Sequence, residues 1–72
     1  MELELLAKDD KSADRGCPSV YLSDTGDFVV QGAGLDDADF AKLADPLPGE
    51  TAVRISPEIV LAAVERYQRR NV

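Results

Sequence analysis

An acidic triplet is the first pattern in this chain that suggests chemistry. Asp24-Thr25-Gly26 follows the apolar run Val20-Tyr21-Leu22. In aspartic proteases two such aspartates meet and share one proton. The next residue here is Asp27, where those enzymes have a small residue, and its charge would disturb a shared-proton pair. Asp and Gly are also the residues that tight turns use. We therefore interpret the triplet as a turn.

A second acidic group, Asp36, Asp37 and Asp39, has the residue type of a divalent-cation site. A calcium loop needs ligands at alternating positions and a closing glutamate, and this spacing lacks both. Helix capping explains the group: Asp36 is expected to be the N-cap, and the helix dipole favours the other two acids. No metal or other cofactor is predicted. A small-ligand or metal-responsive sensor that uses Asp24, Asp27 and Asp36 is the alternative.

The cysteine and histidine counts exclude two kinds of site within one chain, a disulfide and a His/Cys zinc site. The chain has one cysteine, Cys17, and no histidine, so neither a disulfide nor a His/Cys zinc site can form within one chain. We interpret Cys17 as a small buried hydrophobic residue, with an intermolecular disulfide or a redox sensor as the alternative. The carboxylates lie in expected turns and caps, and so small a chain has little room for a concave pocket. We predict no catalytic residue and no enzymatic activity.

The charge of the chain bears on its partners. Its net charge is −6, which repels nucleic-acid phosphates and anionic membranes, so neither is an expected partner. Residues 1–50 carry 12 acids and 4 bases, whereas residues 51–72 carry 2 acids and 4 bases. This indicates a solvated surface whose final arginines complement a helix dipole, or else a bipolar molecule that pairs with itself or with a basic partner. One cysteine and no secretory signal predict a cytoplasmic protein.

Stepwise along the chain, local patterns predict two strands, a helix, a strand and a helix. The apolar runs 20–22 and 28–30 flank a turn with Gly26 at a positive φ, which predicts a β-hairpin. A helix capped by Asp36 is expected to end before Pro46. A third strand follows at 51–55, and Ser56-Pro57 begins a helix that runs to about Arg70.

These elements predict an α+β fold of order ββαβα, a small three-stranded, mainly antiparallel sheet with two helices on one face. Placing the first hairpin strand at the centre keeps all neighbours antiparallel, and we prefer this order to one with a parallel pair. Residues 16–72 are expected to form a single small domain and residues 1–15 a flexible N-terminal segment. The alternative for the latter is an edge strand with Leu3 and Leu5 facing inward.

Strand alternation predicts an interaction surface. The pairing that buries most apolar surface points one set of side chains toward the helices: Val20, Leu22, Phe28 and Val30. Tyr21 and Val29 then lie on the reverse face, and Leu61 falls outside the apolar stripe of the last helix. Exposed apolar patches often mark contacts. Tyr21, Val29 and Leu61 therefore form the predicted interaction face, for a homodimer or a protein partner.

The hairpin carries a family resemblance. Its motif residues are Cys17, Pro18, Val20, Tyr21, Asp24, Gly26, Val29, Val30, Gln31 and Gly32. Together with Leu35 and residues 48–55, they resemble a group of small actinobacterial proteins of unassigned function, encoded near helix-turn-helix regulators; the resemblance covers roughly residues 3–65. It implies an accessory role in gene regulation or development and no catalytic residues. We expect a small acidic protein-interaction module, accessory to a transcriptional regulator, with an acidic antitoxin-like inhibitor as a further alternative.

Overall fold

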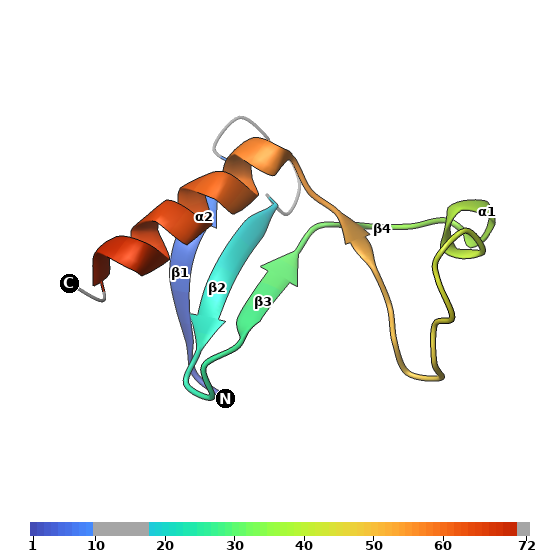
Figure 1. Ribbon diagram of the computed structural model, residues 1–72, viewed down its shortest axis with the longest axis horizontal. Coiled ribbons are helices and arrows are strands. Elements are labelled where there is room, and N and C mark those ends of the chain that lie inside the picture. Colours follow the sequence, from blue (N-terminus) through green and yellow to red (C-terminus); the bar gives the residue numbers. More distant parts are fainter. Residues whose placement is uncertain (10–17, 71–72) are drawn as a thin grey trace.

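The computed structural model describes residues 1–9 and 18–70. Its elements are, in chain order, β1 (Leu3–Lys8), β2 (Ser19–Ser23), β3 (Phe28–Gln31), β4 (Ala33–Gly34), α1 (Asp37–Phe40), β5 (Val53–Arg54) and α2 (Pro57–Arg70). The first three strands form an antiparallel sheet in the order β1-β2-β3, and β4 pairs with β5 in a separate two-stranded ribbon (Figure 1). The described residues therefore form an α+β fold, as expected.

The hairpin of β2 and β3 is confirmed, with Val20 opposite Val30 and Leu22 opposite Phe28. Its turn is closed by two backbone hydrogen bonds, from the Ser23 amide to the Asp27 carbonyl at 2.9 Å and from the Gly26 amide to the Ser23 carbonyl at 3.1 Å. The Ser23 hydroxyl also accepts from the Asp27 amide at 3.1 Å. Asp24-Thr25-Gly26 thus serves turn geometry.

Gly26 gives the first testable prediction. Its φ of 91° is one that residues with a Cβ rarely adopt, and no atom lies within 4 Å of a Cβ built there. We expect Gly26→Ala to lower the free energy of unfolding by about 1 kcal/mol through backbone strain alone. Gly26→Asn should lose less, because Asn tolerates the left-handed region. Urea unfolding followed by circular dichroism measures both, and equal stability of all three proteins would contradict the turn.

The third strand of the sheet is not the expected one. β1 pairs with β2, while Val53–Arg54, within the segment 51–55 predicted for that place, pairs with β4 instead. The predicted order ββαβα is therefore corrected to ββββαβα. The reason is length: β1 offers six residues to the ladder and β5 only two. β2 is still the central strand and all pairs are antiparallel.

The N-terminal expectation changes for the residues in this strand. Residues 3–8 belong to the sheet and are not a flexible lead-in. A bulge between Leu5 and Ala7 shifts the register, and Leu6 is buried where the edge-strand alternative had Leu3 and Leu5 inward. Residues 10–15, expected to be flexible, lie outside the described residues. So does Cys17, which was expected to be buried.

Helix α2 has the predicted extent and packs on one face of the sheet, against β1 and β2. The Ser56 hydroxyl accepts a hydrogen bond from the Glu58 amide at 3.3 Å, as its capping role requires. Among the described residues three apolar side chains are buried, namely Leu6, Val20 and Ala63. At the margin of this core the rings of Phe28 and Tyr67 meet edge to face at 5.2 Å. The core therefore lies between α2 and one sheet face.

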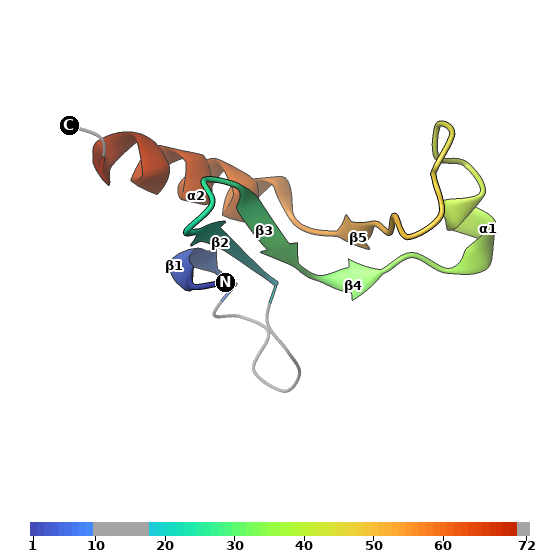
Figure 2. The same cartoon turned by 90° about the horizontal axis from the view of Figure 1, so that it is seen from below.

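Residues 33–54, which we call the arm, project away from this core (Figure 2). The arm consists of the β4–β5 ribbon with α1 and its following loop at the tip. α1 ends at Phe40, short of the predicted limit at Pro46, and α1 does not cover the sheet, so the prediction of two helices on one face is corrected to α2 alone. The radius of gyration is 13.5 Å, whereas a compact chain of this length has about 11 Å.

Local chemistry explains why α1 is short. After Phe40 the Leu43 amide bonds to the Phe40 carbonyl, three residues back, at 3.1 Å, so the chain tightens. Asp45 then adopts a φ of 45° directly before Pro46. A second turn follows, in which the Glu50 amide donates to the Leu47 carbonyl at 2.9 Å and Gly49 has a φ of 90°. These conformations end the helix within the arm tip.

Candidate functional site

The sheet face opposite α2 carries a row of apolar side chains. Leu22 and Val20 pack toward α2, so Tyr21 between them points to the other face. Tyr21 lies opposite Leu5 on β1 and opposite Val29 on β3, and directly opposite residues share a face. We call Leu3, Leu5, Tyr21, Val29 and Gln31 the open face. It crosses all three strands, and the nearest charged side chain on the same side of the sheet is Lys8, at the end of β1 opposite Ser19.

Exposure and hydrogen bonding describe what the open face offers a partner. Leu3 and Leu5 are 48% and 44% exposed, and Tyr21 and Val29 are half-buried. The Tyr21 hydroxyl donates to Gln31 Oε1 at 2.9 Å, which holds the phenol along the sheet and satisfies its polar end. The result is an apolar strip with one aromatic ring in a fixed orientation, the kind of side chain that anchors protein contacts.

The structure brings together only two of the three residues predicted for the interaction face. Tyr21 and Val29 are cross-strand partners. Leu61 is 68% exposed but belongs to α2, which covers the opposite side of the sheet, so it cannot share a surface with them. The sequence reasoning missed Leu3 and Leu5 as neighbours of Tyr21. Their signal was the alternation Glu2-Leu3-Glu4-Leu5, which predicts a strand with both leucines on one side.

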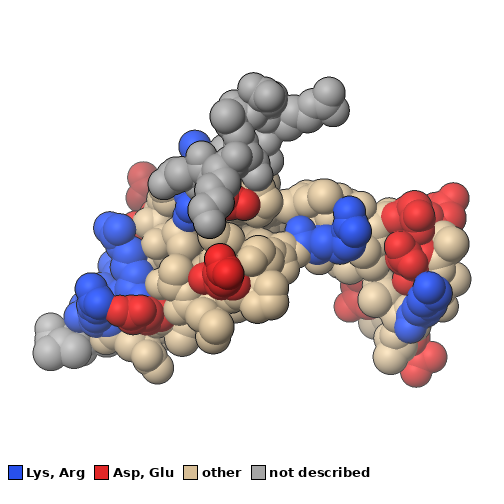
Figure 3. Space-filling model, turned by 90° about the horizontal axis from the view of Figure 1, so that it is seen from above, with Lys and Arg blue, Asp and Glu red and all other residues tan. Residues whose placement is uncertain are grey.

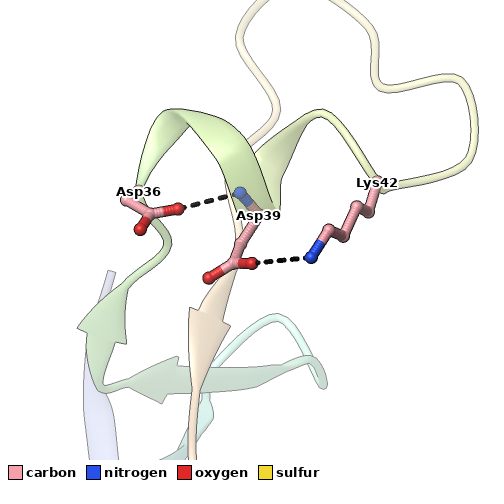
Figure 4. A network of polar contacts seen from close by, with 3 residues as sticks. All are labelled: Asp36, Asp39 and Lys42. Atoms are coloured by element: carbon pink, nitrogen blue, oxygen red, sulfur yellow. Dashed lines mark hydrogen bonds and ion pairs between the residues drawn. The ribbon is translucent and has the colours of Figure 1, made fainter.

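The acidic residues proposed for a sensor do not converge. Asp24 and Asp27 lie in the β2–β3 turn, whereas Asp36 lies at the arm tip. Asp36 Oδ1 accepts from the Asp39 amide at 2.8 Å, and Asp39 Oδ1 accepts from Lys42 Nζ at 3.3 Å (Figure 4). Within residues 1–9 and 18–70, no group of three or more His, Cys, Asp or Glu side chains could hold a metal ion. The predicted N-cap role of Asp36 is confirmed.

An open hollow lies where the C-terminal end of α2 meets β1. Tyr67, Leu22 and Leu3 are among its lining residues, and its charged groups are Glu2, Glu4, Asp24 and Arg70. Arg70 forms a fork on Glu4, with Nη2 2.7 Å from Oε1 and Nε 3.2 Å from Oε2. Both side chains are partly exposed, so the pair contributes little to stability. Because Arg70 is already engaged, the hollow presents no free cation to an anionic ligand.

None of the helices formed by the described residues is long and apolar enough to cross a membrane. Comparison of the chain with protein-family models, curated proteins and solved structures finds no match to any of them.

Proposed function

We propose that this protein is a non-enzymatic interaction module that binds another protein on its open face. The observation that carries the proposal is the row of Leu5, Tyr21 and Val29 across three strands, on the side of the sheet away from α2. Charged residues make up 31% of the chain, yet this row contains none. An apolar strip on so charged a protein favours a contact with an apolar partner surface.

The proposed partner is a transcriptional regulator to which this protein is accessory. This part of the proposal rests on the resemblance of the hairpin motif to small actinobacterial proteins encoded near helix-turn-helix regulators. The net charge of −6 supports contact with the regulator itself, because phosphates of DNA would repel this chain. The contact would be direct and protein to protein.

The test uses a paired substitution on the open face and a matched control on α2. Tyr21→Ser/Val29→Ser removes the ring and one branched side chain from a surface, and Leu61→Ser removes an apolar side chain that is 68% exposed on the other side. Tagged proteins would be used to capture partners from the native host, with binding to the identified partner then measured by calorimetry. We expect the paired variant to lose about tenfold or more in affinity, because buried aromatic anchors dominate such contacts.

Circular dichroism would first establish that both variants fold. Leu61→Ser should bind the captured partner as the wild type does. Unchanged binding by Tyr21→Ser/Val29→Ser, or an equal loss in Leu61→Ser, would refute the open face as the binding surface. Failure of the wild type to capture any protein would refute the function.

A further inference from the structure

We propose that two copies of this chain associate by reciprocal docking, in which the arm tip of each copy lies in a groove beside α2 of the other. The arm tip is residues 35–50, and the groove is lined by Leu6, Ala62, Glu65, Arg66, Arg69 and Arg70. Neither surface includes the open face, so the proposal is independent of the proposed function.

The groove has an apolar floor and a cationic rim. Ala62 supplies most of its accessible apolar surface, because Leu6 at the floor is 4% exposed. On the rim, Arg69 forms an ion pair with Glu65, and Arg70 forms one with Glu4. Arg66 forms no ion pair with any residue in 1–9 or 18–70. The groove therefore offers an unpaired guanidinium beside an apolar surface.

The arm tip has the opposite character. It holds five acids and one base, a net charge of −4: Asp36, Asp37, Asp39, Asp45 and Glu50 against Lys42. In the described part of the chain its one ion pair joins Asp39 to Lys42. Leu47 is 65% exposed and Leu43 is 37% exposed. The tip thus combines unpaired carboxylates with exposed leucines, which complement the rim and the floor of the groove.

These two surfaces cannot meet within one molecule. The arm tip and the C-terminal end of α2 lie at opposite ends of the folded molecule, whose longest dimension is 40 Å (Figure 3). Figure 3 shows the arginine-rich end of α2 and the acidic arm tip on opposite sides of the molecule. Their complementary charges therefore cannot be satisfied within one copy, whereas a second copy offers each surface its complement.

A two-fold arrangement uses both contacts at once. If each arm lies in the other copy's groove, the same contact occurs twice and the assembly closes as a dimer. A stable interface buries about 800 Å² per partner. Because the contact occurs twice, each of the two contacts needs to bury only about half of that area. Elsewhere, two chains of net charge −6 repel each other, so the basic end of α2 is where an acidic arm is attracted.

The experiment compares charge reversals on the two surfaces by sedimentation equilibrium. Arg66→Glu reverses the unpaired cation of the groove, and Asp37→Lys/Asp39→Lys reverses two acids of the arm tip while leaving the Asp36 cap. We expect the wild type to be a dimer and each variant alone to have a dimer dissociation constant raised about tenfold or more. Arg66→Glu places an acid in the groove opposite an acidic arm tip, and Asp37→Lys/Asp39→Lys changes the net charge of the arm tip from −4 to zero. An equimolar mixture of the two variants should dimerise again. In the mixed pair the acid at position 66 faces the lysines introduced at positions 37 and 39, and the unchanged groove faces the unchanged acidic arm tip.

The matched control is Asp27→Lys/Glu58→Lys, which makes the same change of net charge as the arm variant at two exposed positions outside both the arm tip and the groove. It should remain a dimer. The inference is overturned by a monomeric wild type, by dimers that persist in both variants, by a mixture that stays monomeric, or by a control that dissociates as far as the arm variant. It is also overturned if Tyr21→Ser/Val29→Ser dissociates the dimer, a result that would leave the proposed function standing.

Discussion

Leu6→Ala should lower the free energy of unfolding by about 2–5 kcal/mol, the usual loss when a buried leucine is truncated and a cavity remains. Leu6 is 4% exposed and is one of the three buried apolar side chains among the described residues, with Val20 and Ala63. A domain of this length has a total stability of roughly 4–11 kcal/mol. The substitution therefore removes a large share of it, and the variant should be partly unfolded near body temperature.

The control for this prediction lies next to it in the same strand. Leu5 is 44% exposed on the open face, so Leu5→Ala should cost no more than about 1 kcal/mol. Urea unfolding monitored by circular dichroism measures both variants on the same scale. If Leu6→Ala is as stable as Leu5→Ala, then β1 does not contribute to the core, and residues 3–8 behave as the flexible segment that composition alone predicts.

Gly32→Ala should also destabilise the fold, by about 1–3 kcal/mol, because a side chain there overfills a packed junction. A Cβ at Gly32 would lie 2.6 Å from the backbone carbonyl oxygen of Arg54 and 3.5 Å from the Cβ of Val53. That oxygen belongs to the main chain and cannot rotate away, so β5 would have to shift. Gly32 lies between β3 and β4, at the base of the arm.

Gly34→Ala is the matched control, because no atom lies within 4 Å of a Cβ at Gly34. It should change stability by less than about 1 kcal/mol, and in the stabilising direction if it restricts the unfolded chain. Limited proteolysis within residues 41–52 would show whether the arm loosens in Gly32→Ala and not in Gly34→Ala. Equal unfolding curves for the two variants would contradict the close approach of β5 to Gly32.

The elements predicted well from the sequence are those that neighbouring residues determine. Ser56-Pro57-Glu58 sets the start of α2, and its apolar spacing carries the helix to Arg70. Gly26 with Asp24 and Asp27 sets the hairpin turn in the same way. The N-cap at Asp36 was also correct, because capping depends on a side chain and an amide three residues apart.

The pairings of β1 and β5 could not be predicted, because they depend on contacts distant in sequence. Leu3–Lys8 and Val53–Arg54 were both candidates for the place beside β2, and the polar segment after Lys8 favoured the wrong one. The short ribbon of β4 with β5 was missed because Gly32-Ala33-Gly34 has the composition of a strand end. Composition predicts a break there, whereas the close approach of Arg54 to Gly32 is a tertiary contact.

In the candidate site, too, the features set by neighbouring residues were predicted and those set by contacts distant in sequence were not. Period-two alternation places Tyr21 and Val29 on one face of a hairpin, and this needs no knowledge of the rest of the chain. Leu61 was grouped with them because helical spacing shows that a residue is exposed but not on which side of the sheet the helix lies. Leu3 and Leu5 join the open face only through the pairing of β1 with β2.

A photo-crosslinking amino acid at position 21 tests most directly whether the face away from α2 binds another protein. Replacing Tyr21 with a benzoyl-phenylalanine in the native host keeps an aromatic ring on the open face, and the same replacement at Tyr67, whose ring meets Phe28 on the face covered by α2, is the control. Irradiation should join position 21 to a second, different protein and position 67 to none. An absence of such an adduct at position 21, or an equal yield at position 67, would contradict a docking role for this face.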